Sequence, residues 1–167
     1  MHPPPPKKRT VKPLVLHIAG IERMPLESFP DPSTGGSVSW KTLLSCEKTA
    51  TDTFTAGIAV CPPGKASSCP ASSSPGCKEG EQPGHLKLHR HTHAEIYHVI
   101  GGKGIVGIDG EEYVVEKGDV VFIPGDAEHG IKNTGREELV WLYVFAADGF
   151  GEVVYRFSDD RKPKAKL

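Results

Sequence analysis

Three histidines and a glutamate lie close together in the segment HRHTHAE, which covers residues 89–95. Imidazole nitrogens and carboxylate oxygens are good ligands for first-row transition metals. His89 and His91 alternate, so their side chains would leave the same face of a strand. A short turn after His91 would reverse the chain and bring Glu95 beside both imidazoles. The segment therefore predicts three metal ligands from one hairpin, with a fourth ligand supplied by another strand.

Glycines frame this segment at regular intervals. His89, His91, Glu95 and Gly102 follow the pattern G-x5-H-x-H-x3-E-x6-G, except that Gly84 stands one residue too close to the first histidine. This pattern resembles the first sequence motif of the cupin family. The resemblance therefore depends on whether the second motif of that family is also present.

The segment GDVVFIPGDAEHGIKN resembles that second motif, G-x5-P-x-G-x2-H-x3-N. Four residues stand at the expected intervals: Gly118, Pro124, His129 and Asn133. Asp126 replaces one glycine of the motif, and the neighbouring Gly125 is expected to supply the flexible turn in its place. The resemblance covers about residues 84–146 closely and the flanking segments only in their general β character.

The resemblance implies an all-β fold, a double-stranded β-helix or jelly-roll barrel that encloses a metal. It also implies the ligands, which would be His89, His91, Glu95 and His129. The expected cofactor is one divalent transition metal. Fe(II) is favoured, although Mn, Ni, Co or Zn would suit the same donors.

Other polar side chains near these motifs suggest roles in catalysis. His93 matches no ligand position and is expected at the rim of the site, where it could act as an acid or base. Tyr97 alternates with Glu95 and so should face the barrel interior, where it is a second candidate for moving a proton. His98 should face away from the metal. Asp126 and Glu128 are interpreted as turn residues.

The resemblance leaves three kinds of function open. The first hypothesis is a non-haem Fe(II) dioxygenase, an oxidoreductase whose small organic substrate chelates the metal. The second is a redox-neutral isomerase or lyase, in which the metal polarises a carbonyl or carboxylate and Tyr97 or His93 moves a proton. The third is a non-catalytic cupin that binds a small ligand.

The barrel that positions these residues must come from short strands separated by turns. A strand is predicted at residues 14–19, 38–46, 54–61, 85–91, 95–101, 104–109, 112–117, 119–124, 128–133 and 138–146. Asp109-Gly110 predicts a two-residue hairpin turn, because both residues tolerate positive φ. Trp141, Tyr143 and Phe145 alternate on the last strand, which places them in the core or on a pocket wall. No long helix is predicted, apart from a short turn near residues 25–29.

Composition divides the 167-residue chain into one domain with two tails. A proline-rich and basic tail is predicted at residues 1–13, a single cupin domain at 14–157 and a basic tail at 158–167. Within the domain, residues 62–83 are rich in Ser, Pro and Gly and predict a mobile surface loop. A disulfide between Cys69 and Cys77 in this loop is not favoured, because the chain is expected in a reducing compartment.

Charge and hydropathy narrow the expected partners. The formal net charge is −1, so no positive field would attract nucleic acid. No apolar run is long enough to cross a membrane or to serve as a secretory signal, and a cytoplasmic protein is therefore expected. In a eukaryote, Ala165-Lys166-Leu167 would resemble a peroxisomal address. The partner is expected to be a small-molecule substrate, and residues 14–19 are a candidate edge or exchanged strand in a homodimer.

Overall fold

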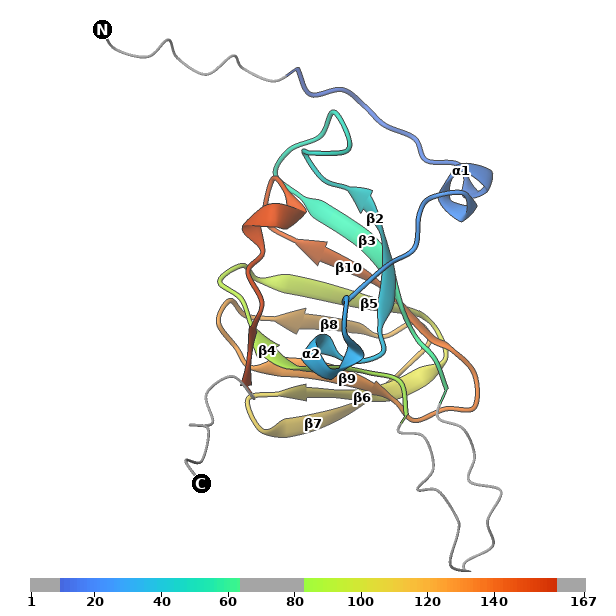
Figure 1. Ribbon diagram of the computed structural model, residues 1–167, viewed down its shortest axis with the longest axis vertical. Coiled ribbons are helices and arrows are strands. Elements are labelled where there is room, and N and C mark those ends of the chain that lie inside the picture. Colours follow the sequence, from blue (N-terminus) through green and yellow to red (C-terminus); the bar gives the residue numbers. More distant parts are fainter. Residues whose placement is uncertain (1–9, 64–82, 159–167) are drawn as a thin grey trace, which may run out of the picture.

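A computed structural model describes residues 10–63 and 83–158 of the protein (Figure 1). Its strands form two antiparallel sheets. In spatial order, the first sheet contains β1 (Glu27–Ser28), β2 (Ser39–Leu44), β3 (Thr55–Cys61), β10 (Leu139–Phe145), β5 (Glu95–Gly101) and β8 (Val120–Ile123). The second contains β11 (Arg156–Phe157), β4 (His85–Arg90), β9 (His129–Asn133), β6 (Lys103–Ile108) and β7 (Glu111–Glu116).

The connections between these strands give the jelly-roll topology. After β4 the chain crosses to β5 in the first sheet and returns for β6 and β7, and then β8, β9 and β10 lie in alternate sheets. Nine of the ten predicted strands overlap strands of the structure. The predicted double-stranded β-helix is therefore confirmed.

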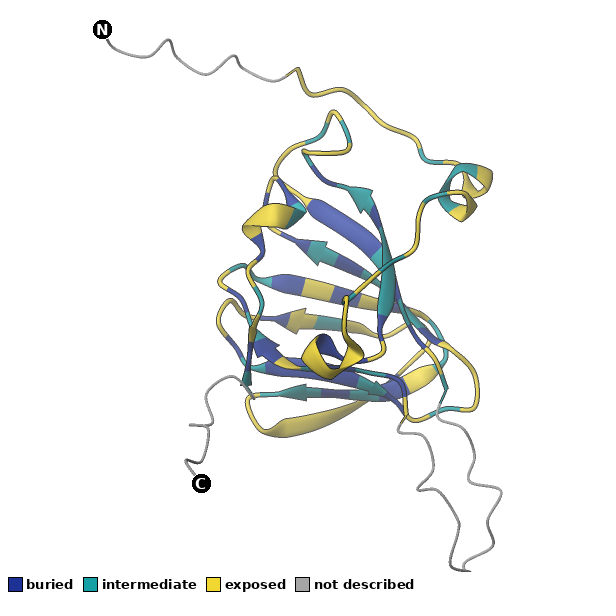
Figure 2. Ribbon diagram, viewed as in Figure 1, coloured by how far each residue is buried: buried dark blue, intermediate teal, exposed yellow. Residues whose placement is uncertain are grey.

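Residues with different burial alternate along β5, as the ribbon colours of Figure 2 show. On β5, Tyr97 and Val99 are buried, whereas Ile96, His98 and Ile100 are exposed. On β10 the buried set is Leu139, Trp141, Tyr143 and Phe145. This alternation brings aromatic side chains from both sheets into one interior, and it also turns His98 outward as predicted.

Two predicted turns have different outcomes. The hairpin between β6 and β7 is confirmed, with Asp109 at φ 48° and Gly110 at φ 92°. The prediction that Gly125 supplies the flexible position before β9 is wrong, because Asp126 itself has positive φ, at 63°. Gly125 is needed for a different reason. A Cβ atom there would lie 2.3 Å from the carbonyl oxygen of Thr92.

The strand predicted at residues 14–19 is also wrong. This segment runs without regular structure into the short helix α1 (Ile18–Glu22), which buries no side chain. Strand β2 pairs with β3 on one side, and on the other side β1 pairs with it at Ser39 and Trp40, whereas residues 14–19 pair with no described strand. Instead of the helical turn expected near residues 25–29, the chain forms the two-residue strand β1.

Three further short elements were not predicted: α2 (Pro32–Gly35), the 3₁₀ helix η1 (Phe150–Glu152) and β11. Pro32 opens α2, and the Asp31 carboxylate caps it by accepting from the Ser33 N–H at 2.8 Å. Within residues 10–63 and 83–158, no helix is long and apolar enough to cross a membrane.

Several predictions concern residues outside the described ranges. They include most of the N-terminal tail, nearly all of the loop at residues 62–83 and most of the C-terminal tail. Cys69, Cys77 and the tripeptide Ala165-Lys166-Leu167 also lie outside the described residues.

Candidate metal centre

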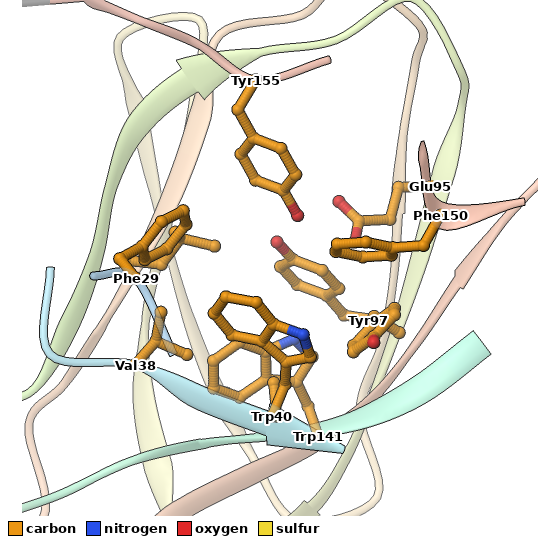
Figure 3. Close-up of a pocket in the computed structure, with 11 residues that line it drawn as sticks. Phe29, Val38, Trp40, Glu95, Tyr97, Trp141, Phe150 and Tyr155 are labelled. Atoms are coloured by element: carbon orange, nitrogen blue, oxygen red, sulfur yellow. The ribbon is translucent and has the colours of Figure 1, made fainter. Parts of the chain in front are cut away.

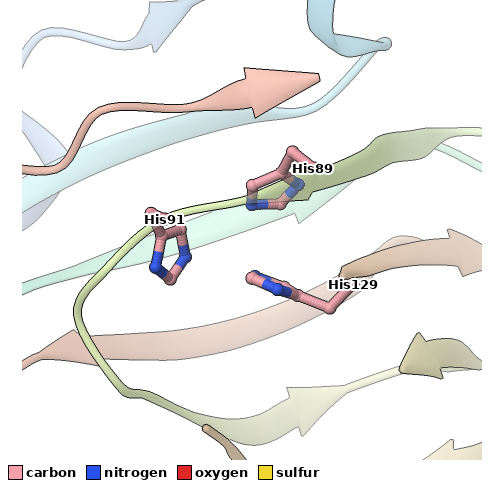
Figure 4. Close-up of side chains that lie close together, drawn as sticks. All are labelled: His89, His91 and His129. Carbon is pink, nitrogen blue, oxygen red and sulfur yellow. The ribbon is translucent and has the colours of Figure 1, made fainter. Parts of the chain in front are cut away.

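Three buried histidines from two adjacent strands of the second sheet meet inside the barrel (Figure 4). His89 lies near the end of β4 and His129 begins β9, and the two residues are directly opposite in the strand pairing. His91 follows β4 immediately. Their side chains are at most 1% exposed, and one nitrogen from each ring lies within 4.8 Å of the others. This arrangement can hold a metal ion.

Each imidazole is oriented by a main-chain carbonyl two residues away in the sequence. The Nδ1 atoms of His89, His91 and His129 lie 2.8 Å, 2.8 Å and 2.9 Å from the carbonyl oxygens of residues 87, 93 and 127. A carbonyl only accepts, so each Nδ1 carries the proton and each Nε2 presents a lone pair. That is the form of histidine that binds metals.

Glu95, the first residue of β5, lies beside two of these histidines and has a carboxylate that is 2% exposed. Its Oε2 atom lies 3.3 Å from Nε2 of His91 and 3.2 Å from Nε2 of His129. Burial and the neighbouring His129 hold the pKa of His89 well below its ordinary value, so this imidazole is neutral at pH 7. The three imidazoles and Glu95 therefore provide the donor types of a divalent metal site.

A bound cation would also resolve an imbalance in hydrogen bonding. Among the described residues, the buried Nε2 atoms of His89 and His91 have no hydrogen-bond partner. A buried polar atom without a partner costs free energy of about 1–3 kcal/mol. Both atoms face the space between the rings, so the residues present fit a metal ion.

The two candidates for proton transfer lie in different surroundings. Tyr97 is 1% exposed, and its hydroxyl donates to the carboxylate of Glu95. Burial, and then the charge of Glu95, raise the pKa of Tyr97 well above its ordinary value. His93 lies in the turn between β4 and β5, where its carbonyl orients His91. Its side chain is not among the described side chains that line the cavity beside Glu95.

That cavity is walled mostly by aromatic rings (Figure 3). We call five of these residues the aromatic cage: Phe29, Trp40, Trp141, Tyr143 and Phe150. Tyr97 and Tyr155 also line the cavity, and Figure 3 shows their hydroxyls pointing toward one another. Glu95 is the one charged residue among the described side chains of the wall.

Tyr155 is the main residue of the site that sequence reasoning missed. Its ring stacks on the imidazole of His89, with ring centroids 4.5 Å apart and planes tilted by 22°. Burial, and then Glu95, raise the pKa of Tyr155 well above its ordinary value. Tyr155 stands outside both motifs, as do Phe29, Trp40 and Phe150, so the motif spacing gave no signal for any of them.

Comparisons with known proteins agree with this architecture. The family model described as a cupin domain matches residues 78–145. The curated dimethylsulfoniopropionate lyase DddW of Ruegeria pomeroyi is 36% identical over 142 residues, which cover 85% of this chain and 80% of that protein. The chain is a cupin. The predicted family membership is therefore confirmed.

Solved structures resemble this cupin at lower sequence identity. A structure described as belonging to the DMSP lyases RdDddP and RnDddQII has a TM-score of 0.61 and 16% identity, covering 84% of this cupin and 65% of that chain. A predicted oxalate decarboxylase from Thermotoga maritima has a TM-score of 0.60 and 24% identity, covering 80% of this cupin and 99% of that chain. At these identities the structures support the fold alone.

Proposed function

We propose that this cupin is a metal-dependent lyase that cleaves a small sulfonium carboxylate of the dimethylsulfoniopropionate type. The aromatic cage beside the metal centre carries this proposal. The 36% identity to a dimethylsulfoniopropionate lyase over 85% of the chain supports it independently. We further propose that His89, His91, Glu95 and His129 hold the metal, with Fe(II) tested first and Mn, Ni, Co and Zn as alternatives.

The walls of the cavity suit a positively charged group without hydrogen-bonding capacity. Aromatic faces attract cations through their quadrupoles, and a dimethylsulfonium group has no N–H with which to bind anything else. The rings of Phe29 and Trp40 meet edge to face, with their centroids 5.1 Å apart. The centroids of Trp40 and Phe150 lie 6.1 Å apart. The cavity wall contains no basic side chain among the described residues. The lack of a basic side chain favours a sulfonium over a phosphate or a second carboxylate. Among the described residues of the cage, the Nε1 atoms of Trp40 and Trp141 and the Tyr143 hydroxyl have no hydrogen-bond partner and could also donate to a ligand.

The opposite end of such a substrate would face the histidines. When bound there, a divalent cation attracts the substrate carboxylate, makes the neighbouring C–H more acidic and opposes the effect of Glu95 on the tyrosines. With the sulfonium in the aromatic cage, the bond between sulfur and carbon would lie near Tyr97 and Tyr155. Orientation of this kind supplies much of the rate enhancement in enzymes.

The proposed reaction is a β-elimination that needs no oxidant. Burial and Glu95 raise the pKa of Tyr97, so its phenolate would form only where a bound cation offsets both effects; in that form Tyr97 takes the proton from the carbon next to the substrate carboxylate. The electron pair of that C–H bond forms a C=C bond, and the C–S bond breaks with its pair on sulfur. The products are acrylate, dimethyl sulfide and the proton now held by Tyr97. The Tyr155 hydroxyl is directed at Tyr97 and can stabilise the phenolate by donating a hydrogen bond.

A dioxygenase remains the second candidate function, because four protein donors leave room for both a substrate and dioxygen on an octahedral metal. The two functions differ in their need for oxygen. A non-catalytic binding protein would convert no substrate, either with or without oxygen. His93 stays a weaker candidate for proton transfer than Tyr97, since its side chain does not line the described part of the cavity.

The test uses protein purified without a histidine tag, stripped with a chelator and reloaded with one metal at a time. Each sample is incubated with dimethylsulfoniopropionate with and without oxygen, and dimethyl sulfide and acrylate are measured by chromatography. We expect equal yields under both conditions and none without metal. Absence of dimethyl sulfide with all five metals would reject the lyase. Oxygen uptake coupled to substrate loss would favour the dioxygenase.

We also propose a homodimer formed by the outer face of the first sheet. Strand register aligns apolar side chains across β3, β10, β5 and β8 in the rows Ile58–Leu142–His98–Val120 and Ala56–Val144–Ile96–Phe122. Ile96 is 41% exposed and Phe122 is 63% exposed. From β3 to β8 these rows hold no Lys, Arg, Asp or Glu side chain, and the first charged residue is Lys41, which continues the first row on β2. A second copy of the same face is therefore the partner that suits this part of the sheet. The proposed compartment is the cytoplasm.

A further inference from the structure

Asp126 adopts a backbone conformation that its residue type disfavours. Its φ is 63°, in the left-handed region, at the position where the second cupin motif has glycine. A residue with a Cβ atom costs about 1–2 kcal/mol there, although aspartate tolerates the region better than most. Backbone strain that a structure retains is a reason to ask what the side chain does.

The side chain and main chain of Asp126 connect three parts of the site. Its main-chain N–H donates to the carbonyl of His91 at 2.8 Å, and its carbonyl accepts from Arg90 Nη1 at 2.9 Å. Its carboxylate accepts from Nη2 of Arg156 in β11. Asp126 therefore links the backbone of a metal-centre histidine to the last strand of the domain.

That last strand carries the aromatic cover of the metal centre. Arg156 pairs with Arg90, and Phe157 pairs with His89. Tyr155 and Phe157 flank Arg156, and their ring centroids lie 4.5 Å and 5.8 Å from that of His89. With only two paired residues, β11 has few main-chain hydrogen bonds of its own. A second link exists nearby, where the Ser158 hydroxyl donates to the carboxylate of Glu128.

We propose that Asp126 is a positioning residue that acts through Arg156 to hold Tyr155 against the imidazole of His89. The side chains of Arg156 and Asp126 are 50% and 59% exposed, so their ion pair is partly screened. The Ser158 link and the β11 pairing remain when the pair is removed. We therefore expect a partial release of Tyr155, with about a two- to fivefold loss in any property that depends on its position.

The test reads the surroundings of Tyr155 directly and does not depend on the substrate. The four tyrosines of the chain are labelled with 3-fluorotyrosine, and the Tyr155 signal is assigned in ¹⁹F NMR spectra by its loss in Tyr155→Phe. In Asp126→Gly we expect this signal to move toward the position of the free amino acid, while metal content stays at the wild-type level. Arg156→Gln should cause the same change, and the double variant should add nothing further.

A matched control is available in the second sheet. Lys132 and Glu112 form a 2.8 Å ion pair whose side chains are 44% and 62% exposed, so Lys132→Gln removes a pair of similar exposure away from β11. We expect this variant to leave the Tyr155 signal unchanged, and Arg156→Lys to restore it toward wild type by keeping the charge.

The alternative is that Asp126 only shapes its turn. In that case Asp126→Gly would relieve the positive φ, raise the melting temperature and leave the Tyr155 signal in place, and this result would overturn the proposal. A shift of the same size in Lys132→Gln would also overturn it. If wild-type protein released no dimethyl sulfide, the proposed lyase activity would fail while the NMR result would still decide the role of Asp126.

Discussion

At the residue scale, the candidate metal centre depends on hydrogen bonds that each histidine makes within its own segment. The imidazoles of His89, His91 and His129 donate from Nδ1 to carbonyls two residues away, which leaves all three Nε2 atoms directed inward. Glu95 reaches two of those atoms from the facing sheet. The ring orientations are therefore set before any ion binds, which is the arrangement that favours a metal site over a set of ordinary core histidines.

Replacing His129 with alanine should remove most of the bound metal while the fold is kept. His129 would contribute a ligand nitrogen from β9, but the strand pairing around it does not depend on its side chain. Metal is measured by mass spectrometry on untagged protein, and the fold by circular dichroism. His98→Ala is the control, because His98 lies on the exposed face of β5. Wild-type metal content in His129→Ala would contradict the ligand assignment.

Tyr97→Phe should lower kcat by about a hundredfold or more, the usual contribution of a positioned acid or base, with metal content unchanged. Tyr155→Phe should have a smaller effect, because its proposed role is to donate a hydrogen bond to Tyr97. Tyr113→Phe is the matched control, since Tyr113 is 51% exposed on β7. Rates are followed as dimethyl sulfide release. Wild-type kcat in Tyr97→Phe would rule this residue out as the base.

At the element scale, close approaches of the backbone hold the ligand-bearing loops together. The loop before β9 passes so near the turn between β4 and β5 that a Cβ atom at Gly125 would lie 2.3 Å from the carbonyl oxygen of Thr92. One main-chain hydrogen bond, from the Asp126 N–H to the His91 carbonyl, continues this contact. The two cupin motifs are thus joined by backbone contacts as well as by any shared metal.

Gly125→Ala should therefore destabilise the protein, by about 1–3 kcal/mol in the free energy of unfolding, because one of the two loops must move. Gly20→Ala serves as its control, since a Cβ atom there meets nothing within 4 Å. Urea titrations of both variants, stripped of metal, give the comparison. Equal stability of the two variants would show that the loops have room to adjust.

The sequence predicted the long strands well, because strand alternation is a local signal, and its motif spacing selected four candidate ligands that the structure brings close together. It predicted nine strands and the turn at Asp109-Gly110, and it brought His129 to the other three candidates through the family resemblance. The strand prediction at residues 14–19 failed, because apolar composition alone does not show whether a sheet has a free edge with which the segment could pair. Tyr155 and Trp40 were not predicted as site residues, because their place in the cavity depends on pairing between distant segments.

At the scale of the whole molecule, one barrel separates two kinds of apolar surface. The interior surface forms the aromatic cage around the cavity, and the outer face of the first sheet forms the proposed dimer contact. Both arise from the same strands, because β5 and β10 carry apolar residues on both faces. A sheet that is apolar on both sides is expected where both sides are covered.

Phe122→Glu should therefore shift the protein from dimer to monomer in analytical ultracentrifugation, since it places a charge within an apolar contact. Val114→Glu is the control, because Val114 is 79% exposed on β7 of the other sheet. The site lies inside the barrel, so both variants should bind metal as the wild type does. A monomeric wild-type protein, or a dimer that Phe122→Glu leaves intact, would contradict the proposed interface.

The most direct test of the account is a crystal structure of the metal-loaded protein with an unreactive analogue of the proposed substrate, in which a trimethylammonium group replaces the dimethylsulfonium. We predict one metal at His89, His91, Glu95 and His129, with the analogue's carboxylate directed toward it. The ammonium group should lie in the aromatic cage, between Trp40 and Trp141. An analogue bound outside the cavity, or a metal held by other residues, would contradict the central claim.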